Sequence, residues 1–127
     1  MPDKVVGGLV AGSASGLDCA QSSAPYNLRW NDGTWRTIAP AISGVQLLCW
    51  RFDATTGEVW RNGQSLGTAT YTPNPIGGVV TLGANYQGRS GFYKGGVAEF
   101  IYFSRALEDE ERQAVEGYLN GRYTIYS

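Results

Sequence analysis

Two dipeptides that favour tight chain reversals limit what this sequence can fold into. Asp32-Gly33 and Asn62-Gly63 each stand between short runs that carry aromatic residues. Both pairs suit hairpin turns, whose central residues need positive φ. The sequence contains 18 glycines, so we expect further tight turns along its length. These features predict an all-β chain of short antiparallel strands.

The expected strands flank these turns. One strand ends at Trp30, and its partner runs over 34–38 after Asn31-Asp32-Gly33. The stretch 46–52 is the most apolar, and a turn over 53–57 leads into a strand at 58–61. A strand over 64–70 returns after Asn62-Gly63. Weaker strands are expected at 4–11 and 79–82, and 12–25 is a long loop or a weak strand flanked by loops.

Two elements close the chain. Residues 96–103 alternate with a period of two, which predicts a strand with Val97, Ile101 and Phe103 toward the core. The period then changes to about 3.6, which predicts a C-terminal α-helix over about 108–121. The chain enters this helix from Ser104 or the Arg105-Ala106 step and leaves it at Gly121. The following residues fall along one side: Leu107, Glu111, Val115, Tyr118, Leu119 and Arg122.

Length and charge narrow the function classes. The 127 residues fit a single domain over 1–127. A formal net charge of -1 and the lack of a basic run argue against a nucleic-acid partner. The longest apolar stretch near the N-terminus is too short and too rich in glycine for membrane insertion, and no signal peptide is visible.

Catalytic chemistry finds little support. The sequence has no histidine, so a Ser or Cys nucleophile would need Lys4 or Lys94 as its base. Glycoside hydrolysis needs two carboxyl groups held about 5 Å apart or somewhat further. Glu58 and Glu99 each stand alone on their strands, and the acidic residues 108–111 suit the positive end of a helix dipole. We therefore expect no catalytic residues and no enzymatic activity.

The two cysteines leave one question open. Cys49 lies in the apolar run 47–50, which favours a buried free thiol. A disulfide with Cys19 is the alternative, since spacing alone cannot establish or exclude it. Two cysteines without histidine are too few ligands for a zinc site.

Two segments together carry a family resemblance. In 52–67, a strand and a short turn precede Trp60-Arg61-Asn62-Gly63. In 82–107, Leu82-Gly83 is followed by a variable loop, Gly95-Gly96, an apolar run with Glu99, and Arg105-Ala106-Leu107, and a helix-like run over 109–119 comes next. This ordering resembles the concanavalin A-like lectin/glucanase superfamily, in particular laminin-G-like domains of bacterial and phage proteins. The resemblance implies an antiparallel β-sandwich with jelly-roll topology.

The front half departs from that family. Many members open with a strand that pairs with the closing one, and no such opening is found here. The fold is then shortened at its N-terminus, or the chain is the C-terminal part of a larger fold, or another chain completes the sheets. Open sheet edges invite association, so we expect a homo-oligomer or a larger assembly. The resemblance also implies an extracellular or virion-surface location.

Ligand binding has two candidate forms. A sugar needs an aromatic platform beside planar polar side chains. Trp30 and Trp35 flank one hairpin and are expected to be cross-strand partners. The candidate residues are Trp30, Trp35, Trp60, Asn85, Tyr86, Gln87, Arg89 and Tyr93. Calcium, which the resemblance suggests, would be held by Asn31 with Asp32, or by Asp53, although these residues also fit simple turn chemistry.

Three functions follow from these patterns. The first is a non-catalytic carbohydrate-binding or adhesin-type module, as in a phage tail fibre or a bacterial surface protein. The second is a structural virion or assembly component, such as a capsid decoration or tail protein, with no small-molecule ligand. The third is a degenerate glycosidase-like domain.

Overall fold

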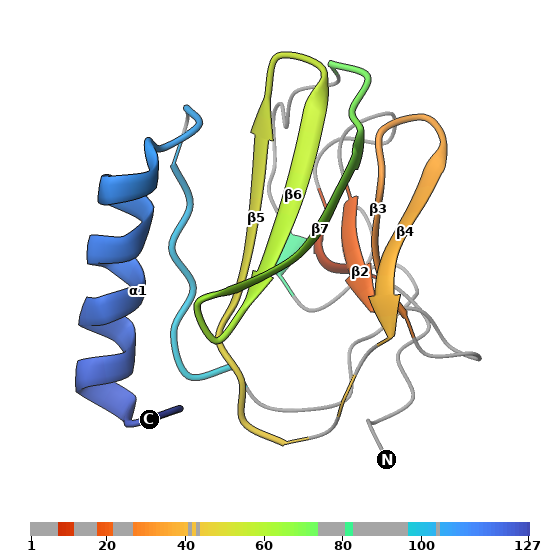
Figure 1. Cartoon of the computed structure of the whole chain (residues 1–127). Helices are drawn as coiled ribbons and strands as arrows, with labels where there is room; N and C mark the ends of the chain where they lie inside the picture. The colour runs from red at the N-terminus through yellow and green to blue at the C-terminus, as the bar shows by residue number, and fades with distance from the viewer. Residues whose placement is uncertain are drawn as a thin grey trace.

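The chain forms two antiparallel sheets and one C-terminal helix (Figure 1). The computed structural model describes residues 8–11, 18–21, 27–40, 42, 44–73, 81–82, 97–103 and 105–127. One sheet has the strand order β4-β3-β2-β1-β8, and the other has the order β5-β6-β7. The predicted β-rich class with a C-terminal helix is therefore confirmed, while the jelly-roll topology stays a prediction.

The strands are short and follow the predicted turns. Their bounds are β1 Gly8–Ala11, β2 Asp18–Gln21, β3 Asn27–Asn31, β4 Trp35–Pro40, β5 Leu48–Asp53, β6 Thr56–Arg61, β7 Gln64–Thr70 and β8 Thr81–Leu82. At the β6–β7 turn, φ is 51° at Asn62 and 80° at Gly63, as a two-residue hairpin of this kind requires. The β5–β6 turn is tighter than predicted. It consists of Ala54 and Thr55 alone, because Ala54 adopts a φ of 51° and lets β6 begin at Thr56.

An apolar core fills the space between the two sheets. Leu28 and Trp30 of β3 pack with Val59 of β6 and Tyr71, and all four are buried. The Trp30 ring lies directly over β6. A Cβ atom at Gly57 would come within 2.5 Å of Trp30 Cζ2, so only glycine fits at that position.

The β5-β6-β7 sheet is covered on both of its faces. Val59 and Trp60 are neighbours on β6, so their side chains point to opposite faces, yet both are buried. Val59 faces the other sheet. The helix α1 (Asp109–Tyr123) lies along the other face of this sheet (Figure 1). There the Arg112 guanidinium stacks on the Trp60 ring. The protein therefore has three layers, with this sheet in the middle.

The predicted strand over 96–103 is wrong for the part that the structure describes. Residues 97–103 belong to neither sheet, and Val97, Ile101 and Phe103 are 38–46% exposed instead of facing the core. Their alternation indicates an extended backbone, but a strand also needs a neighbouring strand to receive its hydrogen bonds. Within the described residues, no strand pairs with this segment. It runs beside α1 instead (Figure 1).

The helix α1 begins within one residue of its predicted start and ends two residues after its predicted end. Its N-cap is Glu108, and the Glu111 carboxylate accepts a hydrogen bond from the Glu108 backbone N–H at 3.0 Å. Gly121 does not stop the helix. The chain leaves it at Thr124, which takes a left-handed φ of 49°. Of the helices in the described residues, none is long and apolar enough to cross a membrane.

Candidate functional site

Asp32 closes the β3–β4 hairpin from the inside. Its buried carboxylate accepts hydrogen bonds from Thr72 N at 2.9 Å, Trp30 Nε1 at 3.3 Å and Arg36 Nε at 3.4 Å. Burial raises the pKa of this carboxyl, but these three donors outweigh it, so the net pKa lies below the ordinary value. Asp32 thus joins the hairpin to the chain that follows β7.

This arrangement favours turn chemistry over calcium binding at the predicted metal residues. The Asp32 oxygens are occupied by protein donors, and Asn31 Oδ1 accepts a hydrogen bond from Gly33 N at 2.9 Å. Asp53 lies apart from them, at the exposed end of β5 in the other sheet. Among the described residues, no group of three or more His, Cys, Asp or Glu side chains could hold a metal ion.

The predicted sugar-stacking tryptophans have three different environments. Trp30 is fully buried in the core, and Trp60 is buried beneath α1, so neither ring can receive a ligand in this structure. Trp35 is 44% exposed. Trp30 and Trp35 had been expected to pair across the two strands, but they do not. Trp30 lies opposite Arg36, and Trp35 lies opposite Asn31. The prediction placed the two rings on one face, whereas the register puts them on opposite faces.

The outer face of the β3–β4 hairpin brings Trp35 together with polar side chains. The Arg29 guanidinium lies 3.8 Å from the centre of the Trp35 ring. Asn31 is directly opposite Trp35, and Thr37 is directly opposite Arg29. Arg29 Nε is buried and has no hydrogen-bond partner in the described structure, and burial lowers the pKa of Arg29. We call these four residues the Trp35 face.

Five of the predicted ligand residues cannot be placed. Asn85, Tyr86, Gln87, Arg89 and Tyr93 lie outside the described residues. The sequence prediction also missed Arg29, whose guanidinium lies over the Trp35 ring. Its position six residues before Trp35 across a hairpin turn gave a usable signal, because diagonal neighbours on paired strands are within reach of a long side chain.

A second polar assembly lies between α1 and the middle sheet. Arg112 and Glu116 of the helix are both buried and form an ion pair. Arg112 stacks on Trp60 at 4.1 Å from the ring centre, and Arg51 approaches the same ring at 4.7 Å. The most buried side of the helix therefore carries the charged pair Arg112 and Glu116. It differs from the side listed in the sequence analysis, which contains Val115 and Leu119.

Cys49 lies across from Trp60 in the same layer and carries a free thiol. Burial raises the pKa of this thiol to about 11, and the nearby Glu116 carboxylate adds to the rise. Burial also raises the pKa of Glu116, against the opposing charge of Arg112. A protonated thiol is a poor nucleophile and a poor metal ligand, so this layer is built for packing.

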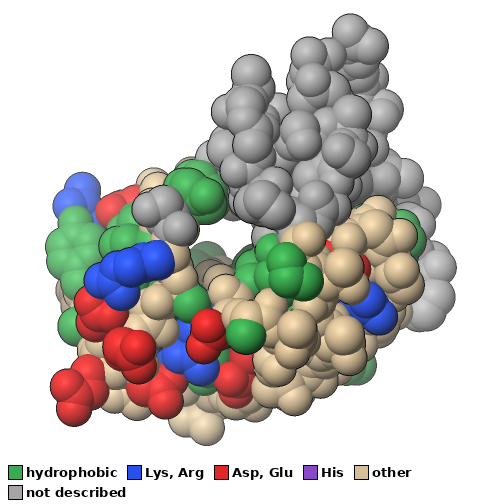
Figure 2. Space-filling model, turned by 90° about the horizontal axis from the view of Figure 1, so that it is seen from above, with side chains coloured by type: hydrophobic (Ala, Val, Ile, Leu, Met, Phe, Trp, Pro, Cys, Tyr) green, Lys and Arg blue, Asp and Glu red, His purple; other side chains and the backbone are tan. Residues whose placement is uncertain are grey.

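Charged side chains of both signs gather at the start of the helix. Arg51 bridges the sheet to the helix, with Nη1 at 2.6 Å from Asp109 Oδ1 and Nη2 at 3.4 Å from Glu58 Oε1. Arg105 pairs with Glu111 at 2.6 Å. In the view from above, acidic and basic side chains alternate on this side of the molecule (Figure 2). Of these three carboxylates, Asp109 and Glu111 belong to the helix, and Glu58 belongs to β6.

Comparisons with protein-family models, with curated proteins and with solved structures give no match for this chain.

Proposed function

We propose that this chain is a non-catalytic carbohydrate-binding module of the concanavalin A/laminin-G-like kind, working outside the cell or on a virion. The Trp35 face carries this proposal. An exposed indole supplies the flat apolar surface on which a pyranose ring stacks. Arg29 and Asn31 beside it can donate hydrogen bonds to ring hydroxyls, and Thr37 can both donate and accept.

The state of the carboxylates supports a non-catalytic function. A glycosidase needs a general acid with a raised pKa within reach of the substrate. Among the described carboxylates, the one whose pKa is raised is Glu116, and it is buried beneath α1 against Arg112. Asp109 and Glu111 pair with Arg51 and Arg105, which lower the pKa of both carboxyls, so neither is an acid ready to donate a proton.

A glycan array followed by titration of the strongest ligand tests the proposal. We expect Trp35→Ala to weaken binding at least tenfold, because the stacking surface is lost, and Trp35→Phe to weaken it less. Ile42→Ala is the matched control, since Ile42 is also 44% exposed but lies outside the hairpin. An array without ligands, or binding that Trp35→Ala leaves intact, contradicts this function.

A structural role in an assembly is the second candidate. The exposed apolar residues of 97–103 favour it, because a surface of this kind more often contacts protein than sugar. This role predicts a blank glycan array from a chain that self-associates or binds other chains.

A further inference from the structure

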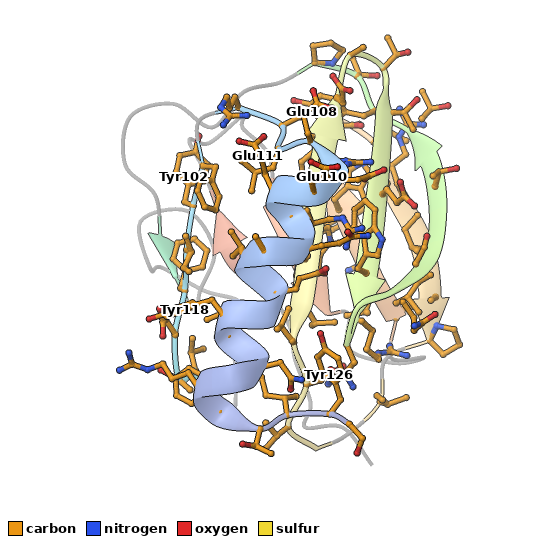
Figure 3. The ribbon with its side chains drawn as sticks, turned by 60° about the vertical axis from the view of Figure 1, so that its left-hand side comes forward. Tyr102, Glu108, Glu110, Glu111, Tyr118 and Tyr126 are labelled. Carbon is orange, nitrogen blue, oxygen red and sulfur yellow. The ribbon has the colours of Figure 1, made fainter. Side chains whose placement is uncertain are left out.

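The segment 97–103 presents the largest run of exposed apolar side chains in the described part of the chain. Together with Tyr118 of α1, which Figure 3 shows on the helix side facing this segment, they form what we call the 97–103 surface. Its large apolar side chains are between 38% and 51% exposed: Val97, Phe100, Ile101, Tyr102, Phe103 and Tyr118. Trp35, Ile42 and Val45, the other exposed large apolar side chains described, do not form a comparable run.

Two polar contacts hold this segment along the helix. Near one end, Glu99 Oε1 accepts a hydrogen bond from Tyr123 Oη at 2.8 Å and lies 3.6 Å from Arg122 Nε. Near the other end, Arg105 pairs with Glu111. Glu111 and Tyr123 are about 18 Å apart along the helix axis. The described residues 97–103 run alongside this helix (Figure 1).

The sequence of this segment is typical of a strand, although the segment pairs with no strand among the described residues. Its backbone N–H and C=O groups belong to no sheet among the described residues, and its side chains are β-branched or aromatic at most positions. Exposed extended backbone beside apolar side chains is the usual template for strand addition.

We propose that the 97–103 surface pairs with the same surface of a second copy of this chain, antiparallel and about a two-fold axis through Tyr102. This register is favoured by charge. It places Glu99 of each copy opposite Arg105 of the other, so two cross-chain ion pairs form at once. It also places Ile101 opposite Phe103, an aliphatic–aromatic pair that stabilises antiparallel strands.

The charges next to the segment fit the same arrangement. Arg122 lies beside Glu99, and Glu111 lies beside Arg105. In the pair of chains, Arg122, Glu99, the second copy's Arg105 and the second copy's Glu111 follow one another with alternating sign. No like charges meet across this register. A two-fold dimer needs this property, because the same surface of both subunits must be complementary to itself.

The exposed area is enough for a weak dimer. Each large side chain of the surface presents about 80 Å², so the six present roughly 450 Å² per copy. The two copies together would bury about 1,000 Å² once backbone is included, the lower limit for a specific interface. The association should therefore depend on concentration in the micromolar range. Figure 1 shows that the surface lies on the opposite side of the molecule from β4, so this association and glycan binding at Trp35 can fail independently.

Sedimentation equilibrium of the full chain over about 1–300 µM tests the proposal, since interfaces at the lower size limit are weak. We expect the mass to rise from one chain toward two, and Ile101→Asp to weaken the association at least tenfold. Val45→Asp is the matched control, because Val45 is 82% exposed and lies in the chain between β4 and β5. Circular dichroism checks that both variants fold. A mass that stays at one chain, or association equal in both variants, overturns the proposal.

A charge exchange tests the register itself. Glu99→Arg alone puts two arginines together at each pairing position, and Arg105→Glu alone puts two glutamates together, so each variant should self-associate at least tenfold more weakly. An equimolar mixture of the two variants restores both ion pairs and should associate about as tightly as the unchanged chain. Each variant has lost one contact with α1, so recovery in the mixture cannot come from restored folding. A mixture no tighter than its components overturns this register.

Discussion

The two faces of the β5-β6-β7 sheet are buried by opposite kinds of chemistry. Toward the other sheet, Val59 packs with Leu28 and Trp30 in an apolar core. Toward α1, the guanidinium groups of Arg112 and Arg51 both lie close to the Trp60 ring. One face is stabilised by removal of apolar surface from water, which is strong and needs no partner atoms in exact register. The other depends on ion pairs whose Coulomb energy must offset their own desolvation.

The two faces should contribute unequally to stability. The apolar core should dominate the free energy of unfolding, whereas the helix interface should fix where α1 sits and add little net stability. Substitutions on the two faces should therefore differ in their cost.

The largest effect is expected in the core. Trp30→Ala removes a fully buried ring that lies against Gly57 and packs edge-on against Phe52, so the free energy of unfolding should fall by about 3–5 kcal/mol. Trp35→Ala is the control, and it should cost less than about 1 kcal/mol because that ring is on the surface. Urea denaturation measures both. Equal losses would mean that Trp30 does not anchor the core.

Breaking the ion pair should come next. Glu116→Ala leaves the Arg112 charge buried with Asp109 as its remaining acidic neighbour, at 3.8 Å, so we expect a loss of about 2–3 kcal/mol. Glu116→Gln keeps a hydrogen-bond acceptor for Arg112 and should cost less. The same denaturation experiment applies, with near-ultraviolet circular dichroism to follow Trp60. If Glu116→Gln proves the more harmful of the two, the pair does not act through its charge alone.

Replacing the whole pair should change stability least among the buried substitutions. Arg112→Met combined with Glu116→Leu removes both charges and fills a similar volume, so the free energy of unfolding should change by less than about 1 kcal/mol in either direction. A loss as large as that of Glu116→Ala would show that the pair stabilises the helix interface and does not merely position it.

The smallest effect concerns acid. The Arg105 side chain and then the Glu108 backbone N–H lower the pKa of Glu111 from 4.5 to about 2. A carboxyl with a lowered pKa in the folded state stabilises the fold above its unfolded value, and this contribution is lost as the pH falls from about 4.5 toward 2. Wild-type and Glu111→Gln stabilities should therefore differ above pH 5 and converge below it. A difference that persists at pH 2 would contradict the assignment.

Local signals explain why part of this architecture could be predicted from the sequence. The turn at Asn62-Gly63 and strand β7 were predicted at their observed positions, because two consecutive positive φ angles need residues of that kind. The helix was predicted from its period and its acidic first turn. Its start was predicted to within one residue, but it continues past the predicted stop at Gly121, because Thr124 accepts a left-handed backbone that glycine would normally take.

Partners distant in the sequence explain what could not be predicted. The i, i+4 spacing of Arg112 and Glu116 indicates an ion pair, but nothing local says that it will be covered by Trp60. The local sequence around Asp32 indicates an exposed turn. It does not show that Thr72, which follows β7, will donate a hydrogen bond to the Asp32 carboxylate. The 97–103 segment has the alternation of a strand, and its sequence cannot say whether a neighbouring strand is present.

The charged outer face of the middle sheet also matters while the chain is being made. The β5-β6-β7 meander is built from contacts close in sequence, and its inner face can be covered by β3 and β4, which are synthesised earlier. Its outer face must wait until the ribosome has added α1. A nascent sheet with an apolar outer face would spend that interval open to aggregation. The charged side chains of Arg51 and Glu58 make this face more polar, which favours solubility of the nascent chain before α1 is added.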